Sequence, residues 1–383
     1  MIPYGRQEIT QDDIDMVSNV LTSDFLTQGP MVPRFEQSVC DLTGAHFATA
    51  VNSATSALHL ACVALGLQQG DWLWTSPNTF VASANCALYC GAKVDFVDID
   101  VDTFNICPDA LEQKLIQAQL KGTLPKVVVP VHFGGQPCDM IRIKRLGDQY
   151  GFTIIEDASH AIGACYENAP VGSCSYSDIT VFSFHPVKII TSGEGGMATT
   201  NDETLDQKMK LLRSHGITRD PVLMTQVSDG PWYYQQVDLG WNYRMTDIHA
   251  ALGLSQMTRL EAYIVRRHLI ADRYDEAFKT GLVKSPLRQV DRYSALHLYV
   301  VQVDPSHSHK DIFTHLREVG IGVNLHYIPV HLQPYYRRFG FSEGDFPHAE
   351  KYYHRAISLP IYPNLSSSQQ DQVITAVQEA TRG

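Results

Sequence analysis

The chain has 383 residues, of which 44% are hydrophobic and 19% charged, so it can bury a sizeable core and is not expected to be disordered. Lys and Arg number 30 against 41 Asp and Glu, and the net charge of −11 disfavours a nucleic-acid partner. The eight cysteines include no Cys-x-x-Cys pair, which indicates neither a disulfide framework nor a metal site. No apolar run approaches the roughly 18 residues of a membrane span. We therefore expect a cytoplasmic, enzyme-sized protein without membrane contact.

From residue 47 to about residue 198, short β-rich runs alternate with helical ones. The predicted strands are 47–52, 72–75, 93–97, 126–130, 152–156, 179–184 and 195–199. Helices are expected over 54–65, 79–89, 108–119 and 139–150. This alternation predicts an α/β fold with a mainly parallel sheet covered by helices. The apolar runs at 127–129 and 153–155 are typical of central strands that are buried on both faces.

In the second half of the chain, the regular alternation of strands and helices ends. A helix is expected near 203–214, followed by an irregular stretch around 220–243 and a long helical pattern from 247 to about 279. Further on we expect a strand at 298–303 and helices at 311–319 and 367–381. We place a domain boundary inside the long helical pattern, which divides the chain into a large domain, residues 1–260, and a small C-terminal domain, residues 261–383.

Two segments carry residues suited to catalysis. Asp157 and His160 come just after a predicted buried strand, and ligands bind at that edge of open α/β sheets. A carboxylate at this place could equally cap the next turn. Lys188 follows the β-run ending at Phe184 and precedes the glycine-rich turn 193–196, so it lies on a short segment, whereas surface lysines are more often on helices.

A third segment, 51–58, ends a strand and begins a helix among small hydroxyl residues. Free N–H groups and the helix dipole make such a turn suitable for phosphate, although an ordinary N-cap from Asn52, Ser53 or Thr55 explains the same pattern. Together the three segments describe a pyridoxal phosphate site. Lys188 would form the Schiff base, Asp157 would keep the pyridine nitrogen protonated, and the turn would hold the phosphate.

The same segments resemble a known family. The motifs that carry the resemblance are Ser53–Leu58, Glu156–Ala161, Phe182–Lys188, Gly193–Gly196 and Gly240–Met245. They are similar to the motifs of the sugar-nucleotide aminotransferases, the DegT/DnrJ/EryC1/StrS group of fold-type I pyridoxal phosphate enzymes. The likeness extends from Leu26–Pro30 to His326–His331. It implies a large mainly parallel-sheet domain and a smaller C-terminal α+β domain.

The resemblance also implies roles for single residues. Lys188 is the catalytic lysine and Asp157 the partner of the ring nitrogen. Phe80 matches the aromatic residue that stacks on the cofactor ring, with a core phenylalanine as the alternative, and His160 contacts the ring oxygen or ring face unless it is structural. Ala54, Thr55 and Ser183 match the phosphate-binding positions.

The family further implies a homodimer, because Asn242 matches an asparagine that reaches the phosphate of the neighbouring subunit. Substrate contacts are implied for Tyr4, Arg6, Thr27, Gly29, His326 and Tyr327. Arg6 could meet a diphosphate or the donor carboxylate, or it could be a surface charge.

Within the family, the segment 183–188 is most similar to the branch that acts in pseudaminic acid biosynthesis. That similarity implies L-glutamate as amino donor and a UDP-linked 4-ketosugar as acceptor. Three alternatives stay open: another nucleotide-linked 3- or 4-ketosugar, a cofactor-dependent sugar dehydratase, and a non-catalytic regulator. The intact Lys188 argues against the dehydratases, in which a histidine takes its place, and with Asp157 and Ser183 it disfavours a regulator.

Overall fold

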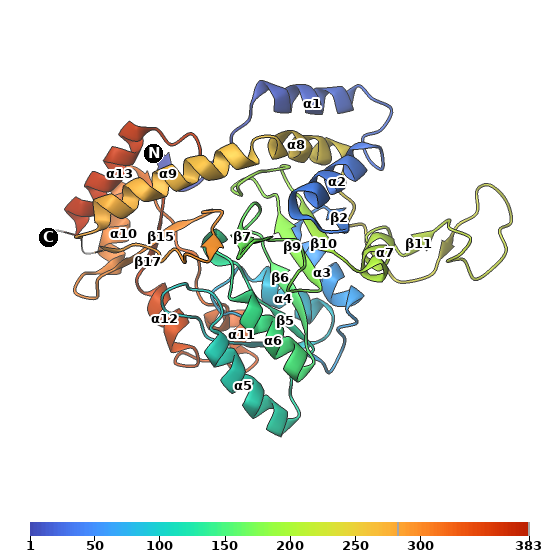
Figure 1. The fold of residues 1–383 in the computed structure, drawn as a ribbon, viewed down its shortest axis with the longest axis horizontal. Coiled ribbons are helices and arrows are strands. Elements are labelled where there is room, and N and C mark those ends of the chain that lie inside the picture. Colours follow the sequence, from blue (N-terminus) through green and yellow to red (C-terminus); the bar gives the residue numbers. More distant parts are fainter. Residues whose placement is uncertain (282, 382–383) are drawn as a thin grey trace.

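The computed structural model describes residues 1–281 and 283–381 (Figure 1). At its centre lies a seven-stranded sheet of order β2-β10-β9-β6-β5-β3-β4. Strand β10 is antiparallel to both neighbours, and the pairings from β9 through β4 are parallel. The strands are β2 (Phe47–Val51), β3 (Trp72–Thr75), β4 (Lys93–Phe96), β5 (Val127–Val129), β6 (Thr153–Asp157), β9 (Ile179–Ser183) and β10 (Gly196–Thr200). The predicted mainly parallel α/β sheet is confirmed, with one reversed strand.

Helices cover both faces of this sheet. Val127 and Val129 pack with helices α3 and α4, whereas Val128 and Ile154 pack with α5 and α6 on the opposite face. The helices are α3 (Ala54–Ala64), α4 (Ala82–Tyr89), α5 (Pro108–Lys121), α6 (Met140–Tyr150) and α7 (Glu203–Leu212). All three residues of β5 are fully buried, as expected for a central parallel strand.

Helix α4 begins three residues later than predicted. The segment before it forms a turn in which the Asn78 N–H donates to Ser76 Oγ at 3.1 Å. The Thr79 hydroxyl lies 2.8 Å from Ser83 Oγ, in the first turn of the helix. The bond to Ser76 gives the Asn78 N–H a partner outside the helix, which accounts for a turn here before the helix starts.

The long helical pattern is broken into two helices, α8 (Asp247–Met257) and α9 (Leu260–Phe278). Arg259 between them leaves helical geometry, with φ −111° and ψ 0°. Its guanidinium pairs with Asp13 at 2.6 Å, and Asp13 lies buried on α1 (Gln11–Leu21). This ion pair ties α1 to the junction of α8 and α9, beside α2 (Met31–Thr43).

The C-terminal part has its own small sheet and core. Strands β13 (Val283–Lys284), β15 (Tyr299–Val303) and β17 (Ala356–Leu359) pair in that order, all antiparallel. Helices α9, α10 (His309–Glu318) and α13 (Ser367–Ala380) contribute to the same hydrophobic cluster. The N-terminal strand β1 (Ile2–Pro3) joins this part, because it pairs with β16 (Ile321–Gly322). The division of the chain at residue 260 stays a proposal.

Short elements complete the fold. They are η1 (Phe133–Gly135), β7 (Cys165–Tyr166), β8 (Ala169–Pro170), β14 (Arg292–Tyr293), η2 (Val330–Leu332), α11 (Pro334–Arg337) and α12 (Pro347–Tyr353). Within residues 1–281 and 283–381, no helix is long and apolar enough to cross a membrane, and no group of three or more His, Cys, Asp or Glu could hold a metal ion.

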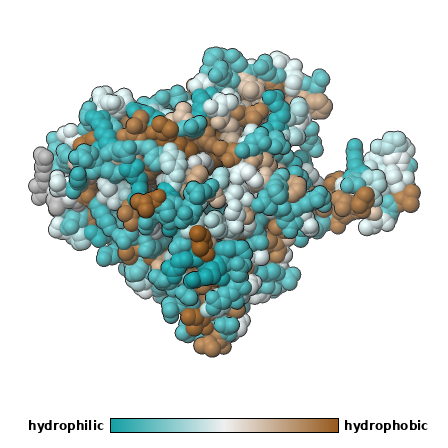
Figure 2. Space-filling model, viewed as in Figure 1, coloured by the Kyte–Doolittle hydropathy of each residue, from teal (hydrophilic) through white to brown (hydrophobic). Residues whose placement is uncertain are grey.

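One segment extends away from the body of the molecule. It contains the two-stranded hairpin of β11 (Ile217–Thr218) and β12 (Gln235–Gln236), at the right of Figure 1. Figure 2 shows apolar surface on this projection. Large apolar side chains are highly exposed there, among them Val222 at 88%, Val227 at 90% and Trp232 at 71%. Exposed apolar side chains gathered on one projection are typical of a protein interface.

Candidate active site

Asp157 lies at the carboxyl end of β6, with 5% of its surface exposed. Its Oδ2 accepts a hydrogen bond from Ser83 Oγ at 2.5 Å, and its Oδ1 accepts one from the Ser159 N–H at 3.0 Å. Two donors therefore hold the carboxylate in one orientation and stabilise its charge.

Lys188 lies on the loop between β9 and β10. The loop is closed on the Phe184 carbonyl, which accepts from the Ser192 N–H and the Thr191 hydroxyl, both at 3.0 Å. The half-buried position of Lys188 lowers the pKa of its amine to about 8, while the nearby Asp157 carboxylate opposes this shift. About a tenth of the amine is therefore neutral at pH 7, far more than for an ordinary lysine, and a neutral amine is a nucleophile and a base.

The start of α3 and the end of β9 meet at Gly196. In the antiparallel ladders of β10, Gly196 pairs with Val51 on one side and with Ser183 on the other. A Cβ atom on Gly196 would lie 2.5 Å from the Ala54 nitrogen, so only glycine permits this approach.

The first turn of α3 offers free donors beside Ser183. Ser53 caps the helix by accepting from the Ser56 N–H at 3.2 Å. Ala54 and Thr55 are the first helical residues, so their N–H groups have no carbonyl partner within the helix. These N–H groups and the hydroxyls of Thr55 and Ser183 suit a phosphate group.

His160 is buried between two hydrogen-bond partners. The Gly134 N–H donates to its Nδ1 at 3.3 Å, so the ring proton is on Nε2 and points to Tyr327 Oη at 3.2 Å. Burial and the Lys188 ammonium hold the pKa of His160 well below its usual value. His160 is accordingly a neutral imidazole in the site.

His326 is a second neutral histidine. Its Nδ1 lies 2.8 Å from Ser358 Oγ, and its ring packs at 5.2 Å from that of Tyr4. Burial, together with the Lys188 ammonium, lowers the pKa of His326 to about 3. His326, from the C-terminal part of the chain, therefore lies close enough to Lys188 to feel its charge.

Phe80 is not a core residue, because 58% of its surface is exposed. Its ring centre lies 6.3 Å from that of Tyr327. An exposed aromatic ring beside a polar, partly buried site is suited to stacking on a flat ligand.

The remaining predicted residues lie at the margins of this site. The Tyr4 carbonyl accepts from the Ile361 N–H at 3.0 Å, and Arg6 is exposed. Thr27 and Gly29 make their contacts with the start of α8: Thr27 bridges to Thr246, and the Gly29 N–H donates to Asp247 at 3.0 Å. The structure brings neither of these two into hydrogen-bond contact with Lys188 or Asp157 among the described residues.

Asn242 is exposed near the start of α3. Its carbonyl lies 3.4 Å from the Asn52 side-chain nitrogen, and its own side-chain amide has no hydrogen-bond partner within the described part of the chain. The amide is thus available to a group outside this protomer.

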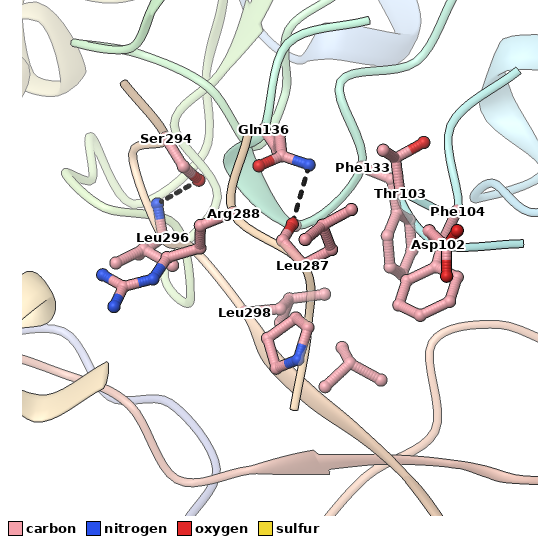
Figure 3. A pocket seen from close by; sticks show the side chains of 13 residues that line it. Asp102, Thr103, Phe104, Phe133, Gln136, Leu287, Arg288, Ser294, Leu296 and Leu298 are labelled. Atoms are coloured by element: carbon pink, nitrogen blue, oxygen red, sulfur yellow. Dashed lines mark hydrogen bonds between the residues drawn. The ribbon is translucent and has the colours of Figure 1, made fainter. Parts of the chain in front are cut away.

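A small pocket of about 30 Å³, whose lining is shown in Figure 3, lies next to Gly134. Gln136 crosses its wall and donates through Nε2 to the Leu287 carbonyl at 3.0 Å. None of the predicted site residues lines this cavity, but Gly134, which holds His160, does. The cavity and the site therefore share a wall.

Neither Ser83 nor Thr79 could be predicted from the sequence as part of the site. Both are fully or almost fully buried and lie 74 and 78 positions from Asp157 along the chain. A serine in a helix of small residues gives no signal of a contact with a distant strand.

Comparisons with known proteins agree with this geometry. Residues 7–378 match the DegT/DnrJ/EryC1/StrS aminotransferase family. The chain is 42% identical to the spore coat polysaccharide biosynthesis protein SpsC of Bacillus subtilis, over 100% of this chain and 97% of that protein. It is 37% identical to the UDP-4-amino-4,6-dideoxy-N-acetyl-beta-L-altrosamine transaminase of Campylobacter jejuni, over 96% of this chain and 94% of that protein.

A solved structure is similar as well. The putative sugar aminotransferase Spr1654 of Streptococcus pneumoniae, in its pyridoxamine phosphate form, superposes with a TM-score of 0.91 at 30% identity, over 100% of this chain and 99% of that chain. The chain belongs to the DegT/DnrJ/EryC1/StrS aminotransferase family. It is a pyridoxal phosphate-dependent sugar aminotransferase, and the predicted family, enzyme class and cofactor are confirmed.

Labelling of Lys188 with a small acylating reagent, followed by peptide mass spectrometry, tests the state of its amine in the cofactor-free protein. Because the neutral amine reacts, the rate should rise with pH through a midpoint of about 8. Asp157→Asn should lower this midpoint, since the carboxylate raises the pKa of Lys188. Exposed Lys279 in the same digest is the internal control. A midpoint near the usual lysine value of about 10.4 would contradict the assignment.

Proposed function

We propose that the protein transfers the amino group of L-glutamate to C4 of UDP-2-acetamido-2,6-dideoxy-β-L-arabino-hexos-4-ulose. The product would be UDP-4-amino-4,6-dideoxy-N-acetyl-β-L-altrosamine. The observation that carries the proposal is the meeting of Lys188, Asp157 and the open turn at Ala54 on one edge of the sheet. The name of the Campylobacter relative supports the choice of sugar.

The residues present suit the cofactor. We assign its ring nitrogen to the Asp157 carboxylate, its phosphate to Ala54, Thr55 and Ser183, and its covalent attachment to Lys188 Nζ. Phe80 would cover one face of the ring, and His160 would contact the ring oxygen or the ring face. When bound, pyridoxal phosphate supplies a carbonyl for the donor amine and a protonated ring that withdraws electrons from the donor Cα.

Lys188 then acts as the acid and base. Its Nζ, about a tenth of which is neutral at pH 7, would take the proton from the donor Cα and return it to C4′ of the cofactor. The same atom moves a proton to C4 of the sugar in the second half of the reaction. The loop closed on Phe184 holds the lysine in place, so orientation contributes much of its effect.

The acceptor would enter from the C-terminal side of the site. We assign its contacts to His326, which lies close to Lys188, to Tyr327, and to Tyr4, which packs on His326. Arg6, exposed beside Tyr4, would bind the diphosphate or the donor carboxylate.

A second acceptor is favoured by one observation. The SpsC protein, at 42% identity, is named for spore coat polysaccharide biosynthesis. Another nucleotide-linked 3- or 4-ketosugar is therefore the alternative substrate.

We also infer a homodimer in which Asn242 and the loop at Thr27 and Gly29 serve the partner's site. The exposed amide of Asn242 and the apolar side chains of the projecting hairpin support a second copy of the chain as the occupant. We place the reaction in the cytoplasm, since the eight cysteines are all free thiols in the structure.

Spectroscopy of the holoenzyme tests the reaction. L-glutamate should bleach the visible band of the bound cofactor, and the proposed UDP-4-ketosugar should restore it with release of the aminated sugar. Two compounds serve as controls. One is the corresponding UDP-linked 3-ketosugar, tested as acceptor, and the other is the sugar aminated at C4 in the opposite configuration, used as a reference for the product. Bleaching by glutamate without recovery would reject the proposed sugar and leave the aminotransferase.

Mixing two defective variants tests the shared site. Lys188→Ala and Asn242→Ala should each be impaired at limiting cofactor, but a hybrid dimer has one site with both residues intact. Random reassociation should restore about a quarter of the sites. Activity no greater than that of the Asn242→Ala protein alone would contradict a site built from two chains.

A further inference from the structure

Within residues 1–281 and 283–381, Ser83 is the one side-chain hydroxyl that hydrogen-bonds to Asp157, the candidate ring-nitrogen partner. Its Oγ lies 2.5 Å from Asp157 Oδ2, and its surface is fully buried. An ionised carboxylate only accepts hydrogen bonds, so the single proton of Ser83 must point to Asp157. This proton makes a charge-assisted bond, which is the strong kind.

Thr79 completes a chain of donors. Its Oγ1 lies 2.8 Å from Ser83 Oγ, and it is 2% exposed. Because the Ser83 proton is already used, Thr79 must donate to Ser83. Successive donors polarise one another in a buried site, so Thr79 strengthens the bond that reaches Asp157.

The backbone of Ser83 contacts Phe80, the residue proposed to stack on the cofactor ring. Its N–H donates to the Phe80 carbonyl at 3.3 Å. One residue thus connects the exposed aromatic ring of Phe80 with the buried carboxylate of Asp157. Ser83 also lies in the first turn of α4, where the helix dipole favours a negative charge.

We propose that Ser83, fixed by Thr79, is a positioning residue that keeps Asp157 an anion and thereby keeps the proton on the cofactor's ring nitrogen. The inference rests on the proposed role of Asp157. A proton shared between a carboxylate and a pyridine nitrogen moves toward the stronger base. The bonds from Ser83 and the Ser159 N–H stabilise the negative charge on the carboxylate, which favours the charged pair.

The other charged and titratable groups near Asp157 do not replace this bond. The Lys188 amine is electrostatically coupled to Asp157, and burial lowers its own pKa to about 8. Tyr327 is also close enough that the Asp157 charge contributes to raising its pKa, after burial. Neither donates a hydrogen bond to the carboxylate in the structure, whereas Ser83 does.

Nitrogen-15 NMR of enzyme loaded with ring-labelled pyridoxal phosphate tests the proposal. In Ser83→Ala the ring-nitrogen resonance should move toward that of an unprotonated pyridine, and turnover with glutamate should fall by about tenfold to a hundredfold. Thr79→Val should shift the resonance in the same direction by less. Thr79→Ser, which keeps the hydroxyl, should restore the wild-type resonance.

Two further variants distinguish a wrong role for Ser83 from a wrong assignment of Asp157 and from a general loss of packing. Thr75→Val removes another buried hydroxyl, which donates to the Val129 carbonyl at 2.8 Å, and should leave the resonance unchanged. Asp157→Asn should give the largest shift. If Asp157→Asn shifts the resonance and Ser83→Ala does not, the role of Ser83 is wrong and the proposed function stands. If Asp157→Asn has no effect either, the assignment of Asp157 itself is wrong. An equal shift in Thr75→Val would mark a general loss of packing and overturn the proposal.

Discussion

The parallel pairing of β6 with β9 is the constraint on which the site depends. Asp157, the last residue of β6, pairs with Val181 of β9. Ser183, the last residue of β9, follows two positions further along that strand. The reversed strand β10 then runs back from this edge and brings Gly196 opposite both Ser183 and Val51. A slip of one residue in either ladder would turn Asp157 or Ser183 to the other face of the sheet. The register therefore places the ring-nitrogen partner and the phosphate donors of the proposed site together.

The electrostatics of the site follow from burial. An acidic chain with a net charge of −11 must still bind an anionic cofactor and an anionic sugar nucleotide. Burial lowers the pKa of Lys188, and burial together with the Lys188 ammonium holds His160 and His326 neutral. The site thus offers neutral hydrogen-bond donors, free backbone N–H groups and one amine, that of Lys188, whose pKa is lowered by burial. Such donors are already oriented before a ligand arrives, so they need little reorganisation during the reaction.

The sequence predicts much of this arrangement because the information is local. Strand and helix periodicity gave the sheet, and the carboxyl ends of the predicted strands indicated Asp157 and the segment before Lys188. The family motifs supplied Phe80, Ala54 and Asn242. What escaped prediction depends on distant contacts: Ser83 meets Asp157 across 74 positions, and the ion pair of Arg259 with Asp13 accompanies the break between α8 and α9. The pairing of β1 with β16 is equally non-local.

The central claim is that Lys188 carries the cofactor at this edge of the sheet. Reduction of the holoenzyme with borohydride, followed by proteolysis and mass spectrometry, tests it most directly. Reduction makes the link between cofactor and lysine permanent, so the modified peptide identifies the residue. We expect a pyridoxyl group on Lys188 and none on Lys188→Ala protein treated in the same way. A pyridoxyl group on a different lysine, or on none, would contradict it.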